Sequence, residues 1–277
     1  MRQVNFPALT GIRILAAYMV YIHHFNPFQA EVFGVGMHYF FDGFHIGVTL
    51  FFVLSGFLIT HRYFDSRDFD LKSYLQKRLA RIYPMYFILT SLTFFLGYFF
   101  FKSYGSLGSY FLNITFLRGF FDDLKFSGIA QGWTLTVEES FYFLAPLFFV
   151  LIKKCKWMVI LIPFCFILLG VFLVGIFQNC NFHGFMNNIN FMLGYTFFGR
   201  IFEFFVGITL GLLLKKNPNY KFKFFTVGGV FGILFFIYFL SILEYHPDSK
   251  LLFIQKSIVN SILLPVFGIM PFFLRTN

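Results

Sequence analysis

Charged residues are scarce in this chain of 277 residues, and apolar residues make up most of it. Only 12% of the residues are Asp, Glu, Lys or Arg, whereas 58% are hydrophobic and 24% aromatic. Soluble domains carry nearer a quarter charged residues, so a water-soluble fold would leave too much apolar surface uncovered. The composition therefore excludes an ordinary soluble domain and predicts a chain whose solvent is largely lipid.

Cysteine is also rare, and several signatures of chemistry are missing. The three cysteines, Cys155, Cys165 and Cys180, are odd in number and lack metal-site spacing, so neither a disulfide framework nor a metal site is expected. No phosphate-binding glycine loop, nucleophile elbow or metal cluster appears. No repeat or linker appears either, and Arg13 interrupts the first apolar run, which argues for a retained span instead of a cleaved signal peptide.

The net charge of +10 is the one feature that could indicate nucleic acid. The basic residues, however, lie between the apolar runs and not on one continuous stretch. Such placement is typical of membrane topology, so we expect membrane lipid and not nucleic acid as the partner of these charges.

Apolar runs long enough to cross a bilayer predict an all-α fold, a polytopic helical membrane bundle. A span needs about 20 mostly apolar residues. A shorter run, at about 108–121, is predicted to be an interfacial or re-entrant segment. The predicted spans are about eight in number: 8–25, 42–60, 82–101, 133–152, 157–178, 192–214, 222–243 and 252–274.

The distribution of Lys and Arg supports this count. With the N-terminus inside, fifteen of the 22 basic residues fall in inside loops and five fall outside. Cytoplasmic loops carry such an excess, so both termini are predicted to be cytoplasmic. Making the short run a crossing would move the later lysine clusters outside.

Arg13 and His24 are ionisable residues within the first predicted span. They are eleven residues apart, which at about 100° per residue places both on one face of a helix, about 16 Å apart along its axis. His23 points about 80° away from that face, so the spacing favours His24 without excluding its neighbour. Ionisable groups in lipid are costly and often functional, although two interfacial histidines would explain the same pattern.

Arg78 and Arg81 lie in residues 71–81, which predict a basic amphipathic helix on the inner membrane surface that leads into the third span. Three-residue spacing puts both guanidiniums on one face. Such a pair suits phosphate binding, whereas the alternative is ordinary inside charge or contact with lipid headgroups.

The segment WTLTVEESFYF, residues 133–143, opens an apolar run with two carboxylates. Glu138 and Glu139 are four and three residues before Tyr142, so either can share a face with that ring. The alternative is that the acidic residues complement the helix dipole and the aromatic residues mark the membrane interface.

A later stretch, GRIFEFFVG at 199–207, pairs Arg200 with Glu203 at a spacing that permits an ion pair inside the membrane. Glycines in LSGFLI and FVGITLG predict close contacts between helices.

Five of these motifs, in this order, resemble acyltransferase family 3, whose members include O-acetylases of bacterial surface polysaccharides. The resemblance covers about residues 5–275 and is carried by ALTGIRILAA (8–17) with His24, GVTLFFVLSGFLI (47–59), KRLARIYPMY (77–86), WTLTVEESFYFLAP (133–146) and GRIFEFFVG (199–207).

The resemblance implies an O-acyltransferase of the bacterial cytoplasmic membrane. It would move an acyl group, commonly acetyl, from cytoplasmic acyl-CoA to a hydroxyl of an envelope polysaccharide or lipid-linked sugar. The family's residues match Arg13 and His24, Arg78 and Arg81, and Glu139 with Tyr142, beside Glu138. In a mechanism that fits the resemblance, Arg78 and Arg81 would hold the donor phosphates, and Arg13 would bind the donor arm or polarise the thioester. His24 would act as the general base or carry the acyl group. Glu139 or Glu138, with Tyr142, would orient His24 or the acceptor.

Two departures from the family leave alternatives open. Its members usually have about ten spans, so we expect one domain over residues 1–277 without the last two, and an inactive truncated relative is one alternative. The second departure is Thr49, which stands where relatives often carry Asp or Ser.

A transporter or flippase of envelope glycan precursors is a further alternative, because it would use the same intramembrane charges as a substrate path.

Overall fold

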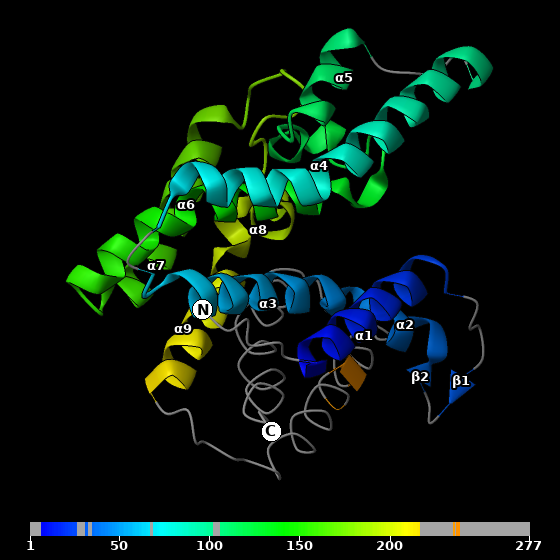
Figure 1. Ribbon diagram of the computed structural model, residues 1–277. Coiled ribbons are helices and arrows are strands. Elements are labelled where there is room, and N and C mark those ends of the chain that lie inside the picture. Colours follow the sequence, from blue (N-terminus) through cyan, green and yellow to red (C-terminus); the bar gives the residue numbers. More distant parts are fainter. Residues whose placement is uncertain are drawn as a thin grey trace. The chain divides into compact units, whose positions relative to one another are not determined.

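The computed structural model describes residues 7–26, 31–32, 35–66, 69–101, 106–216, 235 and 237–238 (Figure 1). These residues are almost entirely helical, and the strands among them, β1 (Glu31–Val32) and β2 (Val35–Gly36), form one short antiparallel pair. They divide into two compact units. The first unit holds the described residues up to His61 and from Phe202 onward, and the second holds Arg62–Ile201.

Three α-helices and part of a fourth, with the 3-10 turn η1 and the β1–β2 pair, make up the described part of the first unit. Its core comes from apolar residues of α1 and α3, with Leu214 from α9. At the start of α3 the two helices lie so close that a Cβ on Gly47 would overlap the carbonyl oxygen of Ala16. The elements are α1 (Pro7–His24), α2 (Met37–Asp42), the 3-10 turn η1 (Gly43–His45), α3 (Ile46–Tyr63) and the later turns of α9 (Phe197–Lys216).

The second unit packs its longer helices α4, α6 and α7 with the short helices α5 and α8. Stacked and edge-on phenylalanines join them, as where Phe148 of α6 meets Phe166 of α7 with ring centroids 5.7 Å apart. Its elements are α4 (Leu71–Leu96), the π-helical turn η2 (Gly97–Phe101), α5 (Leu107–Ile114), the 3-10 turns η3 (Arg118–Phe120), η4 (Asp122–Leu124) and η5 (Ala130–Gly132), α6 (Trp133–Lys154), α7 (Met158–Phe177), α8 (Ile189–Tyr195) and the first turn of α9.

Side-chain caps determine where two of these helices begin. The Asp70 carboxylate accepts hydrogen bonds from the backbone N–H groups of Lys72 and Ser73, both at 3.1 Å, and so satisfies two donors at the start of α4. The side-chain oxygen of Asn188 accepts from Phe191 N at 2.7 Å at the start of α8. The predicted helix at 71–81 is confirmed, and it runs without a break into the third predicted span.

Five helical stretches are long and apolar enough to cross a membrane, and they correspond to five of the predicted spans: Met37–Tyr63, Leu71–Phe100, Ala130–Lys154, Met158–Phe177 and Ile189–Lys216. The predicted span 8–25 is helical as α1, and its crossing stays a prediction. The predicted spans 222–243 and 252–274 lie outside the described residues, apart from residues 235, 237 and 238.

The short run predicted to be interfacial or re-entrant is not a single helix. It contains α5, with eight residues, and then turns into η3. Eight residues rise about 12 Å, far less than the ~30 Å of a bilayer core, so this helix alone cannot cross.

Glycines on facing helices confirm the predicted close contacts in the first unit. A Cβ on Gly56 of α3 would overlap the carbonyl oxygen of Phe204, and a Cβ on Gly207 of α9 would overlap the carbonyl oxygen of Val53. The two backbones therefore touch where each helix has no side chain. Small residues serve the same purpose in many membrane helix pairs.

Candidate functional site

The described site residues fall into one group in each unit. The first group lies at the C-terminal end of α1 and the N-terminal end of α3. The second lies between α4 and α6. Each group joins residues that the sequence analysis singled out with residues that it did not.

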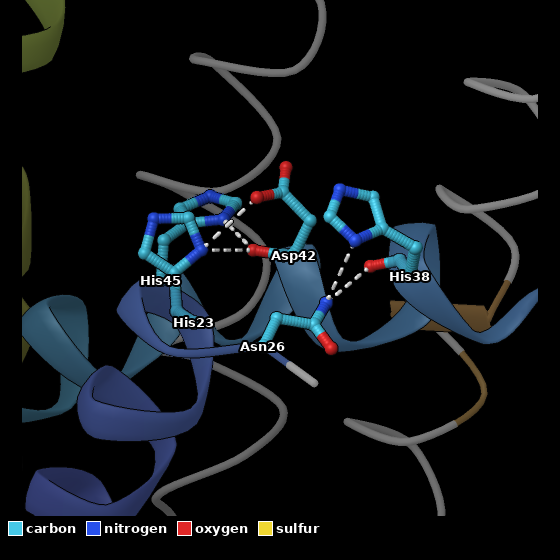
Figure 2. A network of polar contacts seen from close by, with 5 residues as sticks. All are labelled: His23, Asn26, His38, Asp42 and His45. Atoms are coloured by element: carbon cyan, nitrogen blue, oxygen red, sulfur yellow. Dashed lines mark hydrogen bonds and ion pairs between the residues drawn. The ribbon is translucent and has the colours of Figure 1, made fainter. Parts of the chain in front are cut away.

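His23, at the end of α1, is held by Asp42 (Figure 2). Its Nδ1 lies 2.8 Å from the Asp42 carbonyl oxygen and 3.2 Å from the Asp42 carboxylate oxygen Oδ1. His45, in the turn before α3, places its own Nδ1 3.0 Å from the same carbonyl oxygen. The two imidazole rings are 5.7 Å apart.

The chemistry of the acceptor assigns the tautomers of these two histidines. A carbonyl oxygen only accepts hydrogen bonds, so both Nδ1 atoms must carry hydrogen. Neutral His23 and His45 then present the lone pair of Nε2, which is the atom that can take a proton. Asp42 thus orients two potential bases through a single peptide group.

His24, which the spacing from Arg13 favours, is exposed and packs its ring edge-on against His23 at 5.0 Å. None of the hydrogen bonds among the described residues involves His24. Arg13 is half-buried on the same helix. The structure therefore brings His24 beside the Asp42 network without a direct bond to it.

In the second unit Arg78 lies over two tyrosine rings. Its guanidinium carbon is 5.0 Å from the ring centroid of Tyr142, on α6, and 5.9 Å from that of Tyr74, on α4. Arg81 and Lys77 are exposed. Arg78 and Tyr142 are therefore brought together, whereas the use of Arg81 as a second clamp stays a prediction.

Glu138 and Glu139 follow the first turn of α6, near Arg78. Glu139 interacts electrostatically with Glu138 and with Arg78. The Glu139 oxygen Oε1 is buried and has no hydrogen-bond partner among the described residues. Arg78, Glu139 and Tyr142 thus form one polar group within an otherwise apolar pair of helices.

Glu203, which the sequence pairs with Arg200, has a different described partner. Thr49 Oγ1 on α3 donates a hydrogen bond to Glu203 Oε1 on α9 at 3.0 Å, and both residues are buried, at 1% and 0% exposure. Thr49 supplies the donor that a buried carboxylate requires. An ion pair with Arg200 stays a prediction.

Arg118 is fully buried in the loop before α6, and neutral oxygens bind its guanidinium. It donates to Asn113 Oδ1 at 2.9 Å and to the backbone carbonyls of Ser127 and Ile129. Burial lowers the pKa of Arg118. A Cβ on Gly132 would overlap this guanidinium, so Arg118 fastens the loop directly against the start of α6.

Replacing Arg118 by Met should lower the free energy of unfolding by about 3 kcal/mol, because one buried and two half-buried acceptors would lose their donor. Thermal unfolding in detergent would measure the change. Lys156→Met is the matched control, since Lys156 is exposed and should cost less than about 1 kcal/mol. Equal stability of the two variants would contradict this role for Arg118.

Asp42, His45 and Tyr74 are functional candidates that the sequence analysis missed. A signal for Tyr74 was present, because it lies four residues before Arg78 and so shares its helix face. No comparable signal exists for Asp42. It is the last residue of α2, and it contacts His23 only because the chain between α1 and α3 folds back on the end of α1. Among the described residues, no group of three His, Cys, Asp or Glu side chains could hold a metal ion.

Buried and half-buried charges within long apolar helices define an integral membrane protein with a polar interior. The family model described as "Acyltransferase domain" matches residues 6–276. The chain therefore belongs to acyltransferase family 3, as the motifs predicted.

Several curated proteins are similar to parts of the chain. Peptidoglycan O-acetyltransferase OatA of Listeria monocytogenes is 27% identical over 164 residues, which cover 53% of this chain and 25% of that protein. O-acetyltransferase OatA of Staphylococcus aureus is 28% identical over 156 residues, with coverages of 51% and 24%. A provisionally named acetyltransferase of Acidianus two-tailed virus is 35% identical over 102 residues, with coverages of 37% and 30%.

The matched part of the chain spans less than a third of the length of each of these three relatives. No solved structure matches the chain.

Proposed function

We propose that this protein transfers an acyl group, acetyl in the first instance, from cytoplasmic acyl-CoA to a hydroxyl of an envelope polysaccharide or lipid-linked sugar. The observation that carries the proposal is the match of residues 6–276 to the acyltransferase domain. The names of the OatA relatives support acetyl as the group and a carbohydrate as the acceptor.

The protein would work as a single domain in the bacterial cytoplasmic membrane. About eight spans with both termini inside would place α1 and α4 with their N-terminal ends inside. The same topology puts the histidine group, at the end of α1 and the start of α3, on the outer side. The donor would then bind on one side of the membrane and the acceptor on the other.

Arg78 would bind the phosphates of the donor, with Arg81 as a second cation. A guanidinium has five N–H donors in one plane, and this geometry matches phosphate oxygens. Arg13, half-buried within α1, would hold the donor arm or polarise the thioester carbonyl. Glu139 or Glu138, with Tyr142, would orient the reacting groups.

A histidine at the end of α1 would accept the proton of the acceptor hydroxyl. The spacing from Arg13 favours His24, and the contacts with Asp42 make His23 the alternative. The hydroxyl oxygen attacks the thioester carbonyl carbon, the new C–O bond forms and the C–S bond breaks. The proton passes through the imidazole to the leaving thiolate, so the products are an ester and free coenzyme A. In a two-step variant, the imidazole itself would carry the acyl group.

Membranes containing the protein, supplied with acetyl-CoA labelled in the acetyl group, test the proposal. We expect label in envelope polysaccharide as an alkali-labile ester, above the level in membranes without the protein. Labelled glycan precursor crossing the membrane without acetylation would identify a transporter instead. Label in neither assay would indicate an inactive member of the family.

A further inference from the structure

Tyr74 is among the most buried aromatic residues near the second group of site residues, and four contacts hold it. It is 2% exposed. Its hydroxyl donates a hydrogen bond to the Tyr142 carbonyl oxygen at 3.1 Å, and its ring lies 5.0 Å from that of Tyr63 and 5.4 Å from that of Phe69. The fourth contact is the guanidinium of Arg78 at 5.9 Å. The side chain has little freedom to move.

The contacts of Tyr74 determine where Arg78 can lie. Tyr74 and Arg78 are four residues apart on α4, so they share one face of the helix. Because Tyr74 is bonded to the backbone of α6 at Tyr142, the ring of Tyr142 is brought to the same place. The guanidinium thus meets two rings from two helices.

Contact with ring faces leaves the binding capacity of Arg78 largely unused. A cation over a ring is attracted by the π-electrons and gives up none of its N–H donors. The ion pairs of His23 with Asp42 and of Lys125 with Asp122 do not involve Arg78, and its interaction with Glu139 is electrostatic. The five donors are therefore oriented but not occupied by a carboxylate, which is the condition for binding an anion such as phosphate.

Burial distinguishes Arg78 from the basic residues beside it on α4. Arg78 is half-buried and contacts two tyrosine rings, whereas Lys77 and Arg81 are exposed. Ordinary surface charge therefore describes Lys77 and Arg81 better than it describes Arg78.

We propose that Tyr74 is a positioning residue: with Tyr142 it holds the Arg78 guanidinium so that its N–H donors face a phosphate group. The phosphate would belong to the acyl donor, and in this form the inference rests on the proposed function. The headgroup of an anionic phospholipid carries the same chemistry, so the test separates these two sources.

Coenzyme A binding to the purified full chain, in micelles of a detergent without phosphate, is the direct test. We expect Tyr74→Leu to weaken binding about 10-fold, within the range of a partly desolvated cation–π contact. Tyr74→Phe keeps the ring and loses only one hydrogen bond, so its loss should be about threefold. Tyr98→Leu is the control, because Tyr98 is 71% exposed on η2 and should bind as the wild type does.

A double-variant cycle separates positioning from a general structural role. If Tyr74 acts through Arg78, Tyr74→Leu should cause no further loss in an Arg78→Ala background. In the transfer assay, Tyr74→Leu should raise the KM for the donor and leave kcat nearly unchanged. The proposal would be overturned if the losses of coenzyme A binding caused by Tyr74→Leu and Arg78→Ala simply added in the double variant. It would also be overturned if Tyr74→Leu bound coenzyme A as tightly as the wild type.

A second arm measures retained phosphatidylglycerol by native mass spectrometry. Lipid retention that depends on Tyr74 and Arg78, with no coenzyme A binding by the wild type, would support the phosphate site and refute the acyl donor of the proposed function. Binding of neither probe by the wild type would refute the phosphate site itself.

Discussion

Removing both imidazoles at the end of α1, by His23→Ala with His24→Ala, should reduce acyl transfer at least about 100-fold. General acid–base catalysis typically contributes 10²–10⁴ in rate, and no other described histidine is at the end of this helix. Label transfer from acetyl-CoA to polysaccharide would measure the loss. Donor binding should be unchanged, because the donor phosphates are assigned to Arg78.

Single substitutions assign the base within this pair. We expect His24→Ala to carry most of the loss, as its spacing from Arg13 predicts. Asp42→Asn should lower kcat by about 10-fold, since it removes the carboxylate charge 3.2 Å from His23 Nδ1, a contact of about 1.5 kcal/mol with the ring against which His24 packs.

The opposite pattern would identify His23 as the base. In that case His23→Ala and Asp42→Asn would cause the large losses and His24→Ala a small one. His183→Asn serves as a control, because this histidine lies in the second unit at a positive φ that asparagine tolerates. Normal transfer by the double variant would exclude both His23 and His24 as the base.

Adding one methyl group at the α3–α9 contact, by Gly56→Ala, should lower the free energy of unfolding by more than about 2 kcal/mol. The new Cβ would overlap a backbone carbonyl, which cannot rotate away as a side chain can. The two helices would have to separate. Gly207→Ala, on the opposite side of the same contact, should have a similar effect, measured by thermal unfolding in detergent.

Gly175→Ala is the matched control for these two variants. Gly175 lies within α7, and no described atom would come within 4 Å of its Cβ. Alanine is favoured over glycine in a helix by about 0.5–1 kcal/mol, so this substitution should leave stability unchanged or raise it. The close contact of α3 with α9 would be refuted if Gly56→Ala and Gly175→Ala behaved alike.

The helices could be predicted because apolar length is a local property. Runs at 133–152 and 157–178 became α6 and α7 within one or two residues at each end. The N-terminal ends of α4 and α8 lie next to Asp70 and Asn188, whose side chains accept hydrogen bonds from the first backbone N–H groups of these helices. Each of these features depends on residues that are neighbours along the chain.

The site could be predicted only in part. Arg13, His24 and the Glu–Tyr segment are visible because a polar group within an apolar run is conspicuous, and Arg78 is visible because it shares a helix face with Arg81. Asp42 lies at the start of a span, where an acidic residue is unremarkable, and the spacing from Arg78 is a weak signal for Tyr74 in a chain with fifteen tyrosines. Their roles depend on partners from other helices.

The helical membrane class and the charged residues that interrupt its spans followed from the sequence alone, because hydrophobicity and spacing are read along one chain. The family followed from motifs that resemble those of its members. Only the tertiary structure decided which polar groups meet: His23 with Asp42 across 19 residues, Tyr74 with Tyr142 across 68, and Thr49 with Glu203 across 154. Such hydrogen bonds require atoms about 3 Å apart, and their sequence separation carries no information about that distance.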